Sequence, residues 1–99
     1  MLALPPKAIT FQLLMNTEGR ARLHLRVRVH PHDDTESIII TVKNFYGIYS
    51  TEKRSIGVSL EDSQGNILIA RYENFTDNMV VLVRAVEEPP IVLGAAART

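Results

Sequence analysis

Between Ala21 and His30, apolar residues alternate with basic residues almost without interruption. Successive side chains of a strand point to opposite faces, so this alternation predicts a strand with one buried face and one basic face. The apolar positions are Leu23, Leu25, Val27 and Val29, and the basic positions are Arg22, His24, Arg26, Arg28 and His30. A similar alternation from Ile9 to Met15 predicts a preceding strand. Residues 16–20 contain Gly19 and read as a turn, so we expect an antiparallel hairpin.

The pattern changes to a helical spacing after His30-Pro31, because proline ends a strand and disfavours helix in the residue before it. One of residues 33–35 is expected to cap the helix, and Gly47 suits its left-handed C-cap. Residues 38–42 form a β-branched run that would also suit a buried strand. A helix is favoured by the acidic start and by the apolar spacing of Ile38, Val42 and Phe45.

The remaining sequence predicts three more strands. Residues 56–60 and 67–70 read as a hairpin around the turn at 62–66, and residues 71–75 as a single tight turn. Residues 79–83 are apolar on both faces, which is typical of a strand in the middle of a sheet. The expected order is therefore strand, strand, helix, strand, strand, short turn and strand, an α+β fold.

Length and composition fit one small domain. The chain has 99 residues, of which 45% are hydrophobic and 22% charged. Proline pairs at residues 5–6 and 89–90 suggest a domain of a larger protein, with a linker at 1–7, the domain at 8–86 and a linker or tail at 87–99. The tail could also pack on the sheet.

The composition excludes several classes of function. The chain lacks cysteine, so it has no disulfide, thiolate nucleophile or sulfur metal site. It also lacks an apolar run of about 18 residues and an N-terminal signal segment, so we expect an intracellular protein, cytoplasmic or nuclear, without membrane contact. A net charge of zero argues against nucleic acid as a partner. We find no catalytic constellation and no cofactor motif, and expect a non-enzymatic protein.

The element order and three local motifs resemble the ubiquitin-like β-grasp superfamily. Residues 25–31 (LRVRVHP), followed by Asp34-Thr35, resemble the end of the second strand in the ubiquitin family. Residues 43–48 (KNFYGI) are similar to the end of the helix in Ras-association domains, and residues 71–75 (RYENF) to the turn before the last strand of ubiquitin. The resemblance implies a mixed sheet with one helix packed on one face and the second strand at the sheet edge. The chain departs from conjugated modifiers because no glycine pair follows the last strand.

Two subfamilies suggest partners. Ras-association domains bind GTP-loaded small GTPases through basic residues of the second strand and the helix, which by resemblance implies Arg26, Arg28 and Lys43 as contacts. Phox/Bem-type domains pair a basic cluster with an acidic loop. Residues 61–66 resemble that loop in outline but carry Gln64 and Asn66 in place of acids.

The basic strand therefore has two interpretations, which the sequence leaves open. Its cations could protect an edge strand from aggregation. Alternatively, a partner strand could pair with the edge while its acidic side chains meet the basic residues. The candidate partner-binding residues are Arg22, His24, Arg26, Arg28 and Lys43.

Two further features bear on function. Apolar residues expected on the outer face of the sheet could serve docking or self-association, or could be covered by the tail around residues 91–93; these residues are Leu14, Val80 and Leu82. A metal site could use His30, His32, Asp33 or Asp34, but helix capping is the favoured role for Asp33 or Asp34, so no metal is expected.

Overall fold

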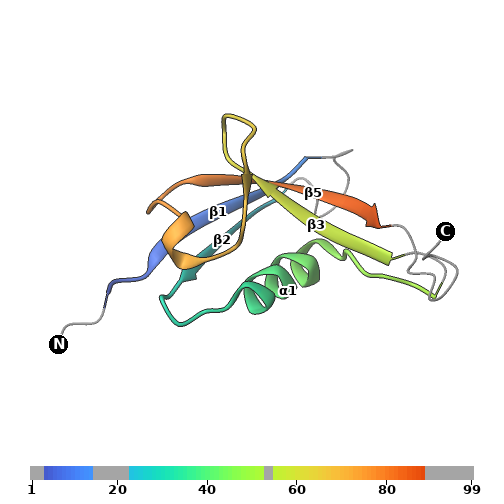
Figure 1. Cartoon of the computed structure of the whole chain (residues 1–99), viewed down its shortest axis with the longest axis horizontal. Helices are drawn as coiled ribbons and strands as arrows, with labels where there is room; N and C mark the ends of the chain where they lie inside the picture. Colours follow the sequence, from blue (N-terminus) through green and yellow to red (C-terminus); the bar gives the residue numbers. More distant parts are fainter. Residues whose placement is uncertain (1–3, 15–22, 53–54, 89–99) are drawn as a thin grey trace, which may run out of the picture.

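The computed structural model describes residues 4–14, 23–52 and 55–88. Within them the chain forms a five-stranded sheet, one α-helix and one short 3-10 helix (Figure 1). The elements are β1 (Lys7–Leu13), β2 (His24–Val29), α1 (Thr35–Tyr46), β3 (Ser55–Glu61), β4 (Ile67–Leu68), the 3-10 helix η2 (Tyr72–Asn74) and β5 (Val80–Glu88). The expected α+β class and element order are confirmed. No helix in the described ranges is long and apolar enough to span a membrane.

The strands lie in the order β2-β1-β5-β3-β4. The β1–β5 pair is parallel and the other neighbouring pairs are antiparallel, so the sheet is mixed. β5 occupies the middle, as its two apolar faces predict. The helix α1 covers one face of the sheet (Figure 1). The opposite face, called the outer face below, carries the residues that alternate with the core.

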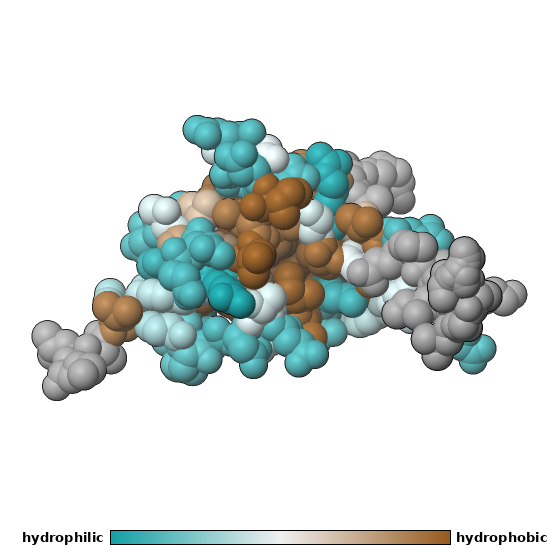
Figure 2. Space-filling model, viewed as in Figure 1, coloured by the Kyte–Doolittle hydropathy of each residue, from teal (hydrophilic) through white to brown (hydrophobic). Residues whose placement is uncertain are grey.

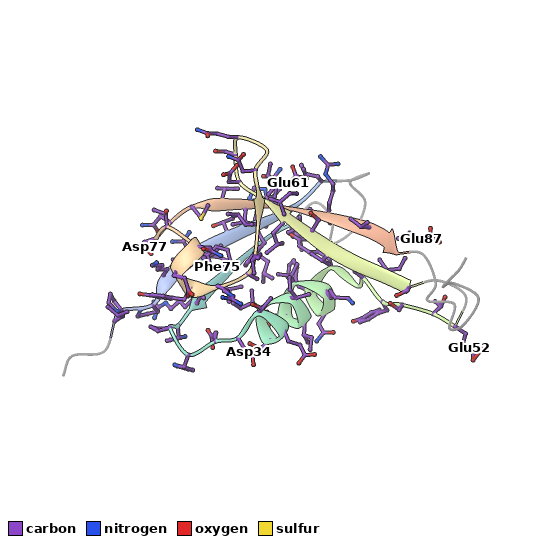
Figure 3. All side chains as sticks on the ribbon, viewed as in Figure 1. Asp34, Glu52, Glu61, Phe75, Asp77 and Glu87 are labelled. Carbon is purple, nitrogen blue, oxygen red and sulfur yellow. The ribbon has the colours of Figure 1, made fainter. Side chains whose placement is uncertain are left out.

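The core lies between α1 and the sheet. The alternating residues of β1 supply Ile9, Phe11 and Leu13 to it, and β5 supplies Val81 and Val83. From the helix come Ile38 and Val42, at the spacing that the sequence predicts. Phe75, close to η2 (Figure 3), packs edge to face on Phe11 with 6.2 Å between ring centroids. Complete burial of each such side chain contributes about 1.5–3 kcal/mol.

The helix begins and ends at capping residues. Asp34 is the N-cap (Figure 3), and its Oδ1 accepts a hydrogen bond from the Ser37 N–H at 2.7 Å. Gly47 is the C-cap at φ 69°, a left-handed conformation that glycine adopts without steric cost, and its N–H donates to the Lys43 carbonyl. The β-branched run is helical, because both ends are capped and its apolar face meets the sheet.

Several boundaries differ from the sequence prediction. β1 begins at Lys7, whose Nζ donates to the carbonyls of Tyr72 (3.0 Å) and Phe75 (2.8 Å), and the Tyr72 hydroxyl donates to the Pro5 carbonyl at 2.6 Å. β5 continues to Glu88, whereas β4 is only two residues long. The strands of the sheet thus begin at Lys7 and end at Glu88. The expected turn at 16–20 and the tail at 91–93 lie outside the described residues.

Candidate functional site

In the described part of the chain, β2 pairs with β1 alone, so it forms one edge of the sheet. Backbone hydrogen bonds on the far side of β1 show which groups of β2 are free. The Thr10 N–H donates to Met79 (3.0 Å), the Leu14 N–H to Val83 (2.8 Å), and the Ala8 carbonyl accepts from Asn78 (2.7 Å). The even-numbered residues of β1 therefore direct their backbone groups toward β5 and the segment that leads into it.

Alternate residues of a strand direct their backbone groups to opposite neighbours. Ile9 and Phe11 consequently face β2, where they lie opposite Val27 and Leu25. It follows that the odd-numbered residues of β2 pair with β1. The N–H and C=O groups that point away from the sheet belong to His24, Arg26 and Arg28.

The open edge ends at His30. Its N–H donates to Asp33 Oδ2 at 2.7 Å, and its carbonyl accepts from the Asp33 N–H at 3.0 Å. Because the Asp33 side chain satisfies this outward-facing donor, strand pairing cannot continue past His30 without breaking the loop. Among the described residues, the free edge therefore extends from His24 to Arg28, and free backbone groups of this kind are a template for another strand.

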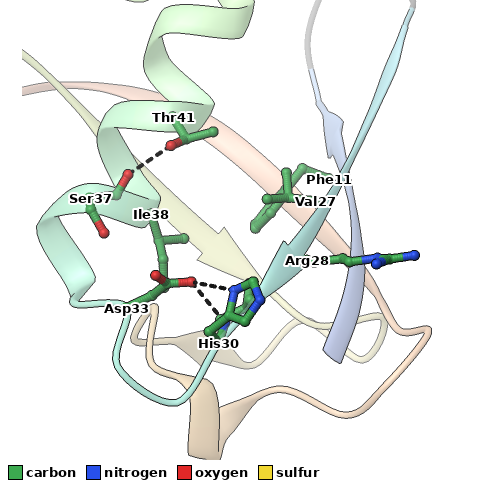
Figure 4. A pocket seen from close by; sticks show the side chains of 9 residues that line it. Phe11, Val27, Arg28, His30, Asp33, Ser37, Ile38 and Thr41 are labelled. Atoms are coloured by element: carbon green, nitrogen blue, oxygen red, sulfur yellow. Dashed lines mark hydrogen bonds and ion pairs between the residues drawn. The ribbon is translucent and has the colours of Figure 1, made fainter. Parts of the chain in front are cut away.

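The basic side chains of β2 lie on the outer face. They differ in whether they already form hydrogen bonds within the protein. Arg26 donates to Thr10 Oγ1 (3.2 Å) and to Asn78 Oδ1 (2.9 Å), so its guanidinium reaches across β1. Asn78 has φ 68°, a left-handed conformation that asparagine tolerates better than most residues. Arg28 has no hydrogen-bond or ion-pair partner among the described residues, and Figure 4 shows it extending away from α1. Arg28 is therefore the arginine of β2 that is free to meet a partner.

The other predicted contact residues have different positions. His24 is exposed on the outer face at the start of the free edge. Lys43 donates from Nζ to the Ile56 carbonyl at 3.2 Å, and Ile56 belongs to β3, on the other side of β1 and β5. The structure thus does not bring the Lys43 ammonium together with the arginines of β2. Arg22 lies outside the described residues.

A groove of about 320 Å³ runs between β2 and α1 (Figure 4). Phe11, Val27 and Ile38 form its apolar part. Ser37 and Thr41 lie along the helix side, and the Thr41 hydroxyl donates to the Ser37 carbonyl at 2.9 Å. This groove was not predicted from the sequence. Its only signal was that Ser37 and Thr41 lie four residues apart, beside the apolar helix face.

Tyr46 fixes the C-terminal end of α1 against β1 and β2. Its hydroxyl contacts the carbonyls of Phe11 (3.0 Å) and Leu23 (2.6 Å), at the end of the β1–β2 ladder. Burial raises the pKa of this hydroxyl above its ordinary value. The contact links the helix to β1 and to the residue that precedes β2.

The outer face carries the predicted apolar residues together with polar pairs. The register places Val80 beside Thr10 and Leu82 beside Gln12, on the face opposite the core. Leu14 is partly buried next to β5, with its N–H bonded to β5. Arg84 and Glu61 form an ion pair at 2.8 Å on this face. The apolar positions are therefore interrupted by charge.

Apolar surface also occurs away from those predicted positions. Figure 2 shows it gathered in the middle of the view, around β3 and the segment between β4 and η2. Ile67 and Ile69 in this region are 67% and 58% exposed, compared with 44% for Val80. Because apolar residues are also exposed in this second region, their distribution does not mark the outer face as a single docking surface.

No protein-family model matches the chain, and comparison with curated proteins gives no match. The features that bear on function are therefore the edge of β2, the groove beside it and the charges around them.

Proposed function

We propose that the chain is a ubiquitin-like β-grasp domain, part of a larger intracellular protein, that binds protein partners without catalysing a reaction. The β-grasp assignment is supported by the element order, by the single helix on one face of a mixed sheet and by the position of β2 at the sheet edge. Each of these is what the sequence resemblance implies.

The observation that carries the proposal is the free edge from His24 to Arg28, with a groove beside it. A strand that pairs with β2 would form main-chain hydrogen bonds to the outward N–H and C=O groups of His24, Arg26 and Arg28. These bonds depend little on the partner's sequence. Selectivity must then come from the partner's side chains.

The geometry defines the chemistry of those side chains. Alternate residues of an added strand would point to the α1 side, over the apolar groove, and the others to the outer face near Arg28. An arginine fork binds a carboxylate well. We therefore infer that the partner segment is extended, with apolar residues alternating with acidic ones.

Pairing of two copies through this edge is disfavoured by charge. An antiparallel β2–β2 pair would bring Arg26 and Arg28 of one copy close to the same residues of the other. Like charges opposite one another in a sheet are destabilising. A partner of different sequence fits the edge better than a second copy does.

A Ras-association-type domain that binds a GTP-loaded small GTPase is the narrower form of the proposal. Arg28 supports it, because this basic residue of β2 is unpaired in the described structure. The bond from Lys43 to β3 does not support the helix contact that the resemblance implies. An acidic strand is therefore the broader class of partner that we propose.

Peptide selection followed by affinity measurement tests the proposal. Peptides selected from a random library on the wild-type domain are expected to alternate acidic and apolar residues, and their binding is expected to weaken with salt. Arg28→Ala removes the side chain and keeps the N–H, whereas Arg28→Pro also removes the outward N–H. We expect Arg28→Ala to weaken binding by up to about fivefold, consistent with a rim charge, and Arg28→Pro to weaken it further.

Arg71→Glu serves as the charge control, because Arg71 is exposed and lies before η2 rather than on β2. It should leave peptide binding unchanged, apart from a small effect of net charge. If the selected peptides bound Arg28→Pro as tightly as the wild type, the edge of β2 would be excluded as their binding site. Self-association that is lost on Val80→Asp would instead indicate a role for the outer face.

A further inference from the structure

The loop between β2 and α1 brings two imidazoles and a carboxylate together. His30 Nδ1 lies 3.6 Å from Asp33 Oδ2, and His32 Nε2 lies 3.8 Å from Asp33 Oδ1. The two imidazole rings are stacked, with 5.3 Å between their centroids. One ligand atom from each residue can be chosen so that all three lie within 4.8 Å of one another.

Asp33 is available because another residue caps the helix. Asp34 accepts the hydrogen bond from the Ser37 N–H, so the first turn of α1 does not depend on the Asp33 carboxylate. Asp33 instead closes the loop through its bonds with the backbone of His30. The capping role, which argued against a metal at this loop, thus belongs to Asp34 and not to Asp33.

The donor atoms suit a transition metal. Zinc binds histidine nitrogen at about 2.0–2.1 Å and carboxylate oxygen at about 2.0–2.2 Å, and in a tetrahedral site such bonds place the ligand atoms roughly 3.3 Å apart. The separations of 3.6 and 3.8 Å end on different oxygens of Asp33, so side-chain rotations must bring one of these oxygens and the two nitrogens to this spacing. Two imidazoles and one carboxylate favour zinc-like ions over Mg²⁺ or Ca²⁺, which prefer oxygen ligands.

We propose that His30, His32 and Asp33 bind a divalent transition-metal ion of the zinc class at the end of the groove between β2 and α1. The His32 side chain is 82% exposed and that of Asp33 28% exposed, so the site opens to solvent on the histidine side. Three protein ligands leave one tetrahedral position for water or another ligand. His30 and Asp33 also line the groove, which places the ion next to the proposed strand-binding edge without depending on it.

Titration of the metal-free domain with Zn²⁺ alone, followed by calorimetry, tests the site. The wild type should bind one ion per chain, and Mg²⁺ should not bind. His32→Ala should weaken Zn²⁺ binding by more than tenfold, because even the loss of an outer-sphere contact commonly costs about 10–100-fold. Asp33→Asn should weaken it similarly while keeping an oxygen that can accept the His30 N–H.

His24→Ala is the matched control, because it removes the third histidine of the chain and leaves the loop intact. It should bind Zn²⁺ as the wild type does, and in NMR spectra the ring signals of His30 and His32, but not His24, should shift with the metal. Far-UV circular dichroism verifies that each variant is folded. The absence of saturable binding, or equal weakening by His24→Ala and His32→Ala, would overturn the proposal.

Discussion

Proline substitution at two adjacent positions of β2 tests the backbone geometry on which the proposed binding edge depends. Val27 lies opposite Ile9 and is inferred to donate its N–H to that residue, whereas the Arg28 N–H points away from the sheet. Proline has no N–H, and within sheets it is tolerated where the lost donor would face solvent. We therefore expect Val27→Pro to be strongly destabilising and Arg28→Pro to be mild.

The expected magnitudes follow from the surroundings of the two N–H groups. Val27→Pro removes one ladder hydrogen bond and leaves the Ile9 carbonyl without its donor, which costs about 1–3 kcal/mol. Ile9 is 0% exposed, so little water can replace the donor. The loss beyond that of Val27→Ala should therefore be about 1–3 kcal/mol. Arg28→Pro should differ from Arg28→Ala by less than about 1 kcal/mol, because no ladder bond is lost and proline restricts the unfolded chain.

Urea unfolding of the four variants, followed by circular dichroism, measures these differences. The alanine variants remove the side chains, so the difference between proline and alanine at each position isolates the backbone effect. For a domain of this size, about 1 kcal/mol corresponds to roughly 4–8 °C in Tm, so the Val27→Pro effect should also be visible in thermal unfolding. If Arg28→Pro lost as much stability relative to alanine as Val27→Pro, the assignment of free backbone groups on β2 would be refuted.

Three further predictions concern stability and its dependence on pH. Asp34→Ala removes the acceptor of the Ser37 N–H and should lower the free energy of unfolding by about 1 kcal/mol in urea; an unchanged value would contradict the capping role. The pKa of Tyr46 is raised by burial, so its stabilising effect is complete below its ordinary value of 10.0 and is lost as the pH rises through the folded-state pKa. Tyr46→Phe should therefore reduce the alkaline fall of the urea midpoint, and an equally steep fall would exclude this residue as a cause. Hydrogen bonds, first that from the Asn66 N–H, lower the pKa of Asp62, so its contribution exists above the ordinary value of 3.8 and is lost as the pH falls through the folded-state pKa. Asp62→Asn should reduce the loss of stability in acid, measured by urea midpoints at neutral and acidic pH, whereas an identical acid profile would argue against it.

The candidate site was only partly predictable from its residues. The alternation identified β2 and the face on which its arginines lie, because side-chain direction in a strand follows a period of two. It did not show that Arg26 is held by Asn78, which lies 52 residues away along the chain. Nor did it show that Lys43 binds the Ile56 carbonyl. Both contacts depend on which strands become neighbours, which the periodicity of a single segment does not encode.

In the loop before the helix, too, the sequence predicted one part of the arrangement and the folded chain decided the rest. The sequence limited the N-cap to residues 33–35, because these polar residues precede the apolar helical spacing. Only the folded chain decided that Asp34 caps α1 while Asp33 faces the histidines. The choice depends on the path by which the chain leaves β2, and that path positions each carboxylate relative to the helix axis.

The sequence by itself determined the elements of this protein: the strands from their alternation, the helix from its spacing and its glycine end, and the central strand from its two apolar faces. These properties arise from interactions between residues close together in the chain. The tertiary structure decided the order of strands, the backbone groups left free on β2 and the groove beside α1. The free edge depends on β1 pairing with β5 on one side and β2 on the other, and the groove depends on the packing of α1 across the sheet.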